Sequence, residues 1–226
     1  PIVGYVRLPD STELKHRIYD SYATQNRAVT QQDYESYVYQ MPTKFGGIKR
    51  CKILRDHDSL KRNLNLYVIC ENAGGTLTAT NSVVKKNLKM WLSKNKMIND
   101  TIDIMDAKII NLGIEFTAVG SLEVPKHDIL NAARQKLIEY YLKYPDVGEP
   151  FFITDIYKEL KKVDGLVDVT DVRITQKLGN AGTRSYSDIR FDLDKATSSD
   201  GRYIKMPSNV IYEIKYPAND ITGVIV

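Results

Sequence analysis

The sequence predicts an α+β protein with two small sheet-plus-helix subdomains, an N-terminal arm and a C-terminal β appendage. Apolar residues recur at helical spacing in several segments that are bounded by capping residues or proline. One long segment, Lys108–Val119, alternates between apolar and polar residues, which is typical of an antiparallel strand with one buried face. After Gly179, short β-prone runs are separated by turn-forming residues. Helices that alternate with antiparallel-looking strands indicate the α+β class.

The 226 residues are enough for one large domain or two small ones. We expect an arm and linker helix over residues 1–28, a first α+β subdomain over 29–105, a second over 106–178 and the β appendage over 179–226. The chain begins at proline rather than methionine, and its first residues read as the middle of a strand or arm. We therefore expect it to be an excised or processed fragment.

Two helices are expected near the start of the chain. The first lies within the arm, where apolar residues recur at four-residue spacing: Leu14, Ile18 and Tyr22. The second begins at Thr30, which makes a capping-box-like start with Asp33. Its apolar face consists of Tyr34, Val38 and Met41, and Pro42 ends it.

The remainder of the first subdomain is predicted as two strands and a helix. Gly47–Arg55 is a strand candidate with poorly defined faces, whereas Leu64–Cys70 alternates more clearly. The pair Gly74-Gly75 breaks the chain. A helix over about 82–95 has the apolar stripe Val84, Leu88, Trp91 and Leu92, with lysines largely opposite.

The second subdomain begins with the alternating strand Lys108–Val119. A helix opened by Pro125 follows, with the apolar stripe Ile129, Leu130, Ala133, Leu137, Tyr140 and Tyr141. A short helix over Thr154–Val163 and a strand over Val167–Ile174 complete it. The expected appendage contains three short β runs, Tyr186–Leu193, Arg202–Met206 and Val210–Tyr216.

Charge and composition restrict the possible functions. The net charge is +4, and five lysines lie between Val83 and Ile98 with no acid among them: Lys85, Lys86, Lys89, Lys94 and Lys96. They could bind phosphate, but we favour the solvated side of a helix, because no arginines or interleaved aromatics accompany them. No apolar run approaches the roughly 20 residues of a membrane span. The 15 tyrosines suit protein interfaces as well as cores.

No constellation of residues indicates catalysis, a metal site or a cofactor site. The two cysteines, Cys51 and Cys70, read as buried free thiols, or as a disulfide if their strands pair in register. His16, His57 and His127 are scattered, and the acids beside His57 belong to a turn-like segment. Gly46-Gly47 and Gly74-Gly75 lack the other residues of a phosphate loop or dinucleotide turn, so we interpret each pair as a hairpin turn.

The segment Tyr22–Ser36 resembles the signature of the baseplate J-like family, whose members are wedge proteins of contractile phage tails. The resemblance rests on the turn Arg27-Ala28-Val29-Thr30 and on Asp33-Tyr34-Glu35 at the start of the next helix. The tail Tyr203–Val210 is similar to the T-even-like branch, which identifies the chain as a C-terminal fragment of such a wedge protein. The signature residues that the resemblance gives a structural role are Arg27, Thr30, Asp33, Tyr34 and Glu35.

The resemblance implies a structural, non-enzymatic function without cofactors. Such a protein dimerises, binds other wedge subunits and links neighbouring wedges into a ring around the central hub, and the ring rearranges when the sheath contracts. It is located in the baseplate of the virion tail after assembly in the host cytoplasm. The alternative is a nucleic-acid-binding α+β module. The open positions of Lys108–Val119 disfavour it because they lack aromatics: Asn111, Gly113, Glu115 and Thr117. An enzyme is a weaker third option.

Overall fold

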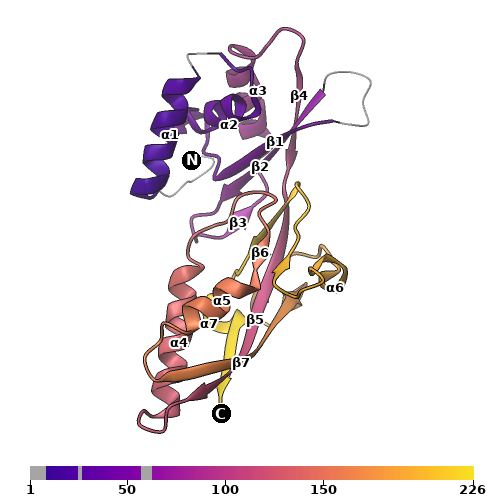
Figure 1. The fold of residues 1–226 in the computed structure, drawn as a ribbon. Coiled ribbons are helices and arrows are strands. Elements are labelled where there is room, and N and C mark those ends of the chain that lie inside the picture. Colours follow the sequence, from indigo (N-terminus) through magenta and orange to yellow (C-terminus); the bar gives the residue numbers. More distant parts are fainter. Residues whose placement is uncertain (1–8, 25–26, 57–62) are drawn as a thin grey trace. The chain divides into compact units, whose positions relative to one another are not determined.

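The α+β class is confirmed by a computed structural model, which describes residues 9–24, 27–56 and 63–226 (Figure 1). The chain divides into two compact units, Pro1–Ala107 and Lys108–Val226. Each unit combines a sheet with helices, and we describe each one separately.

Unit 1 contains three α-helices, a short 3-10 helix and four strands among its described residues. The helices are α1 (Ser11–Ala23), α2 (Gln31–Tyr39), η1 (Thr43–Phe45) and α3 (Ser82–Ser93). The strands are β1 (Arg50–Arg55), β2 (Asn63–Glu71), β3 (Leu77–Thr78) and β4 (Thr101–Asp106). Strand β4 was not predicted, although Ile102 and Ile104 alternate with polar residues there.

Strand β2 is the centre of the unit 1 sheet. It pairs antiparallel with β1 and β3 and parallel with β4. Leu66 and Val68 of β2 are fully buried, together with Leu88 of α3 and Tyr34 and Tyr37 of α2. The apolar faces of α2 and α3 therefore form one core with the sheet, as their sequence periodicity predicts.

Unit 2 contains four α-helices and eight strands. The helices are α4 (Lys126–Tyr140), α5 (Ile153–Leu160), α6 (Leu193–Ala196) and α7 (Pro217–Asp220). The strands are β5 (Lys108–Gly120), β6 (Phe151–Phe152), β7 (Leu166–Lys177), β8 (Asn180–Ala181), β9 (Arg184–Ser185), β10 (Tyr203–Ile204), β11 (Val210–Glu213) and β12 (Ile221–Ile225).

Strand β5 organises the sheet of unit 2. It pairs antiparallel with β7 over most of its length, and parallel with β11 and β12. Alternate residues of β5 are buried against α4 and α5: Ile110, Leu112, Ile114, Phe116 and Ala118. The predicted packing of this strand against the following helix is confirmed, because Ala133 and Leu137 of α4 belong to the same core.

The opposite face of β5 is not open along its whole length, as the sequence suggested. Asn111 is only 1% exposed. Its side chain accepts a hydrogen bond from the backbone N–H of Ser187 at 2.7 Å and donates one to Glu213 at 3.2 Å. The hydroxyl of Tyr186 donates to Asp220 at 2.6 Å. The segment from Tyr186 therefore covers this end of the strand, and it is not the β run that was expected.

Residues 179–226 differ from the expected separate group of short strands in a second respect. Two of their strands, β11 and β12, complete the sheet around β5, and β12 was not predicted at all. β10 instead pairs with β6, and β8 pairs with β9. Strands β10 and β11 lie within the predicted runs Arg202–Met206 and Val210–Tyr216. Strand β12 is short and its partner β5 is distant in the sequence, so local alternation does not identify it.

The two glycine pairs have different roles. Gly74-Gly75 forms the predicted hairpin turn between β2 and β3, with Gly75 at a φ of 78°. Gly46-Gly47 is not a hairpin, because Gly46 ends η1 at a φ of 115°. A methyl group on Gly46 would lie 2.6 Å from a methyl of Val84, so the close approach of α3 requires glycine here.

Candidate assembly surfaces

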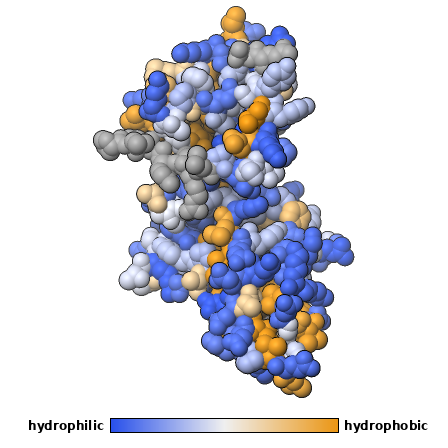
Figure 2. Space-filling view, turned by 90° about the vertical axis from the view of Figure 1, so that its left-hand side faces the viewer, coloured by the Kyte–Doolittle hydropathy of each residue, from blue (hydrophilic) through white to orange (hydrophobic). Residues whose placement is uncertain are grey.

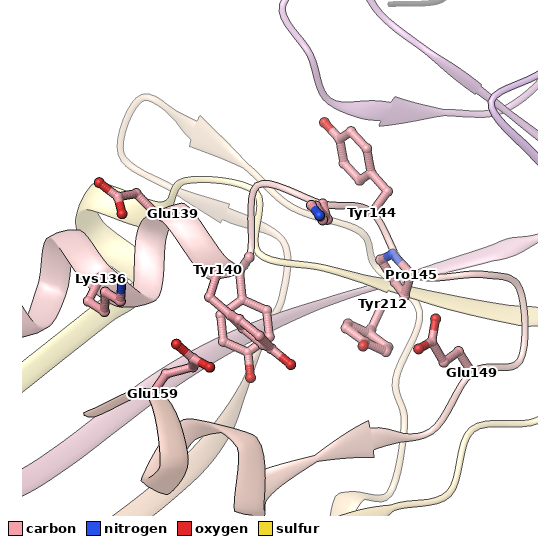
Figure 3. A pocket seen from close by; sticks show the side chains of 10 residues that line it. Lys136, Glu139, Tyr140, Tyr144, Pro145, Glu149, Glu159 and Tyr212 are labelled. Carbon is pink, nitrogen blue, oxygen red and sulfur yellow. The ribbon is translucent and has the colours of Figure 1, made fainter. Parts of the chain in front are cut away.

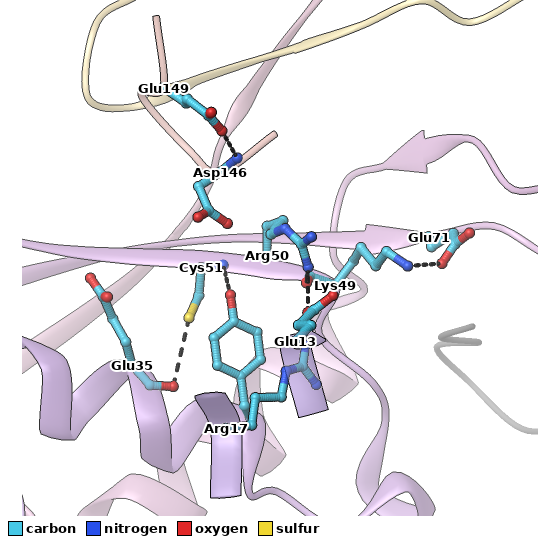
Figure 4. A network of polar contacts seen from close by, with 10 residues as sticks. Glu13, Arg17, Glu35, Lys49, Arg50, Cys51, Glu71, Asp146 and Glu149 are labelled. Carbon is cyan, nitrogen blue, oxygen red and sulfur yellow. Dashed lines mark hydrogen bonds and ion pairs between the residues drawn. The ribbon is translucent and has the colours of Figure 1, made fainter. Parts of the chain in front are cut away.

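Helix α1 contacts the rest of unit 1 through polar residues rather than apolar ones. Asp10 caps its N-terminus, and none of its residues is buried. The Glu13 carboxylate forms ion pairs with Arg17 at 2.6 Å and with Arg50 of β1 at 2.8 Å (Figure 4). The Arg17 guanidinium lies 4.2 Å from the centre of the Tyr39 ring of α2. One charged side of the helix therefore faces α2 and β1.

The ionised form of Glu13 is stabilised in this position. Burial of the carboxyl favours its neutral form, but the charges of Arg50 and Arg17 and their hydrogen bonds lower the pKa of Glu13 below its usual value. Attachment of α1 through this network therefore depends on a charged Glu13.

The apolar stripe of α1 faces away from the rest of unit 1. The exposed fractions of Leu14, Ile18 and Tyr22 are 48%, 61% and 86%, and the adjacent Tyr19 is 73% exposed. The predicted helical spacing is confirmed, yet the stripe packs against no described residue of the core of unit 1. Figure 2 looks onto the side of unit 1 where α1 lies in Figure 1, and hydrophobic residues are visible at that surface. A helix with its charged side inward and its apolar side outward is suited to burial by another molecule.

The signature residues lie directly after this helix, at the start of α2. Thr30 and Asp33 form a complete capping box: the Asp33 N–H donates to the Thr30 hydroxyl, and the Thr30 N–H donates to the Asp33 carboxylate at 2.8 Å. The pKa of Asp33 is lowered although burial opposes this, because it accepts hydrogen bonds from Thr30 and Val29 and lies near the charge of Arg27. The predicted cap is confirmed.

Two more of these residues, Tyr34 and Glu35, connect α2 to the body of unit 1. Tyr34 is 2% exposed, and its hydroxyl donates to Asp100 at 2.7 Å. Burial and this bond raise the pKa of Tyr34 to about 12. Glu35 accepts a hydrogen bond from the backbone N–H of Ile53 in β1 at 3.1 Å. These side chains make contacts within unit 1, so the segment that resembles the signature forms a folded corner. Gln25 and Asn26 of the matched segment lie outside the described residues.

A second apolar group lies at one end of the unit 2 sheet. It surrounds the last residues of β5, where the Gly120 N–H donates to the carbonyl of Val226 and the Ser121 N–H to that of Gly165. Its exposed members are Val119, Leu122, Val124, Val167, Val224 and Val226. Figure 2 shows hydrophobic residues gathered at the lower end of unit 2, where this group lies. Leu122 is completely exposed, at 101%, which again indicates a surface that another molecule can cover.

The lysines of α3 and of the segment directly after it are partly engaged within unit 1. Lys85 forms an ion pair with Asp106 at 2.7 Å, and the Lys96 ammonium donates to the Asp100 carbonyl. This reduces the charge that is available for phosphate and is consistent with the solvated helix face that we expected.

We assign no catalytic role to the cysteines and histidines that the sequence analysis considered. Cys51 and Cys70 are buried free thiols. His127 lies 3.0 Å from Asn131, and His57 lies outside the described residues. Over residues 9–24, 27–56 and 63–226, no group of three histidine, cysteine or acidic side chains could hold a metal ion. In the same part of the chain no helix has the length and hydrophobicity needed to span a membrane.

Comparison with known proteins identifies a fold but no sequence family. No family profile matches the chain, and no curated protein matches it. Its structure is similar to a chain in the cryo-EM structure of the anti-feeding prophage baseplate, solved with six-fold symmetry, with a TM-score of 0.52 and 12% sequence identity. The similarity covers 91% of this chain and 41% of the other, so this chain spans less than half of that protein. At this identity the likeness concerns the fold.

Proposed function

We propose that this chain is a structural, non-enzymatic component of the baseplate of a phage-like contractile tail. The observation that carries the proposal is the fold likeness to a baseplate chain over 91% of the sequence. The signature-like corner at Thr30, Asp33 and Tyr34 supports it, because the capped turn occurs as the sequence resemblance implied. The corresponding location is the virion tail, with assembly in the host cytoplasm.

Within the baseplate, the proposed role is to link wedge subunits into a ring around the central hub and to support its rearrangement on sheath contraction. Two exposed apolar surfaces fit a linking role: the α1 stripe, formed by Leu14, Ile18 and Tyr22, and the group around Leu122. They belong to different units. A subunit with one such surface on each unit can bind two neighbours, either other wedge subunits or a second copy of itself.

We propose the α1 stripe as the surface for self-association. Close packing of two stripes would remove Ile18 and Tyr22 from water, and each fully buried aliphatic or aromatic side chain contributes about 1.5–3 kcal/mol. Symmetric dimers are the commonest soluble assemblies, and a helix face can pair with its own copy around a two-fold axis. The signature residues Arg27 and Glu35 then serve to hold the corner that carries α1.

The self-association is tested by comparing Ile18→Asp with His16→Asp. Both residues are exposed on α1, but they lie on different sides of the helix, and each substitution introduces one negative charge. Light scattering at tens of micromolar should give a dimer for the parent and for His16→Asp, and a monomer near 25.7 kDa for Ile18→Asp. A monomeric parent chain, or a dimer that Ile18→Asp leaves intact, would contradict this assignment.

The baseplate role is tested separately, in the genome that encodes the chain. Deletion of the coding region should give particles without complete baseplates in electron micrographs, and the parent sequence supplied from a plasmid should restore them. Particles that keep normal baseplates after the deletion would refute the structural role.

A further inference from the structure

A pocket of about 430 Å³ lies in unit 2, beside the end of α4 (Figure 3). Four tyrosines from two distant segments line it: Tyr140, Tyr141 and Tyr144, at and just after the end of α4, and Tyr212 of β11. Its size lies within the range of roughly 300–1,000 Å³ that is usual for binding pockets. Its residues take no part in the surfaces described above.

The aromatic rings of the pocket are fixed by packing. The fully buried Phe151 lies behind them, stacked on Tyr141 with ring centres 5.6 Å apart and edge-on to Tyr212 at 5.1 Å. Tyr140 packs edge-on against Tyr141 at 5.0 Å, and its hydroxyl donates to Asp155 at 3.0 Å. A preformed aromatic wall loses little conformational entropy when a ligand binds against it.

Carboxylates surround this wall. Glu139, Glu149 and Glu159 line the pocket, and Glu159 is only 8% exposed. Burial raises the pKa of the Tyr212 phenol, and the nearby negative charges of Glu149, Asp155 and Asp146 raise it further. The phenols are therefore neutral at physiological pH, and carboxylates lie in the same pocket as their rings. Two lysines, Lys136 and Lys143, also line the pocket, and Glu159 forms an ion pair with Lys162 at 2.5 Å, so Glu139 and Glu149 are the carboxylates considered for a ligand.

We infer that this pocket binds an arginine side chain of another polypeptide. A guanidinium is planar, so it can stack on the face of a tyrosine ring while its N–H groups donate to a carboxylate. Tyr140, Tyr141 and Tyr212 supply ring faces, and Glu149 and Glu139 supply acceptors from separate segments. The inference does not depend on the baseplate role, because it concerns only the chemistry of this pocket.

Binding is measured by NMR on the full chain with labelled tyrosine, using the peptide acetyl-Gly-Arg-Gly-amide as the probe. The ring signals of Tyr140, Tyr141 and Tyr212 should shift as the peptide is added. The same peptide with citrulline, which keeps the shape but lacks the charge, should bind roughly fivefold or more weakly. Equal shifts with the citrulline peptide, or no shift up to about 10 mM peptide, a concentration that even millimolar binding would reveal, would overturn the inference.

Two variants connect the binding to the pocket. Glu149→Gln removes one charge but keeps an oxygen that can accept the hydrogen bond from the Asp146 N–H, now at 2.7 Å. It should weaken arginine binding roughly threefold or more. Glu123→Gln removes the same charge from an exposed residue that precedes α4, at the other end of that helix, and should leave binding unchanged. Equal effects of both variants, or ring shifts with inorganic phosphate in place of the peptide, would contradict an arginine site.

Discussion

Replacement of Phe116 by alanine should be among the most destabilising single changes in unit 2. The side chain is 3% exposed and belongs to the core that β5 forms with α4. Its ring lies directly over Gly223, the residue opposite it on β12: a methyl group on that glycine would lie 2.3 Å from the ring. Phe116 therefore packs against the helix layer and also covers the backbone of a neighbouring strand.

The expected cost follows from this burial. Removal of a buried phenylalanine leaves a cavity and destabilises a protein by about 3–5 kcal/mol. Glu115, one position away, points to the other face and makes only a long ion pair with Lys177, at 3.8 Å between partly exposed side chains. Such pairs contribute little, so Glu115→Ala should cost less than about 0.5 kcal/mol.

Urea denaturation of both variants, followed by circular dichroism, checks the difference. With an m-value of about 2 kcal/mol/M, Phe116→Ala should lower the midpoint of the unit 2 transition by roughly 1.5–2.5 M, and Glu115→Ala should hardly move it. Equal losses would mean that both faces of β5 contribute alike, and a larger loss for Glu115→Ala would refute the assignment of the faces. A stable Glu115→Ala protein that fails to enter baseplates would instead place an assembly contact on that face.

Three further changes probe unit 1. Thr30→Ala removes the cap that the Asp33 N–H requires and should cost about 1 kcal/mol in thermal or urea melts, whereas Thr30→Ser should restore most of it. Glu71→Ala removes the carboxylate that pairs with the buried Lys49 at 3.0 Å and should cost about 3–5 kcal/mol in the same melts, and an unchanged midpoint would contradict the buried ion pair. Because the pKa of Glu13 is lowered in the fold, its contribution is present above the ordinary value of 4.5 and is lost as the pH falls through the lowered pKa. The change in the NMR signals of α1 that is due to Glu13 should therefore lie below about pH 4.5, and Glu13→Gln should abolish this step.

The parts of the fold that depend on local sequence could be predicted. The capping box at Thr30, the helix opened by Pro125 and the long strand β5 each follow from residues within one segment. Strand β12 could not be found in this way, because it is short, contains Gly223 and exists only by pairing with β5 across a large sequence separation.

The candidate surfaces show the same limit. The stripe of Leu14, Ile18 and Tyr22 is visible in the sequence, but nothing local indicates that it faces outward. That orientation results from Arg50 of β1, which attracts Glu13 on the opposite side of the helix. The pocket combines Tyr140 and Tyr212 from segments far apart in the chain, so only the tyrosine-rich composition hinted at it.

The order of the strands along the chain has a consequence for how unit 2 folds. Ile114 of β5 pairs with Ile221 of β12. The backbone groups on that edge of β5 therefore stay unpaired until β12, which is synthesised much later, has formed. Such non-local pairing closes a large loop and slows folding. During synthesis, unit 1 can complete its sheet first, while β5 exposes unpaired backbone groups that invite pairing with other chains. We therefore expect high expression temperatures to favour aggregation through β5, and slow synthesis at low temperature to increase the yield of folded protein.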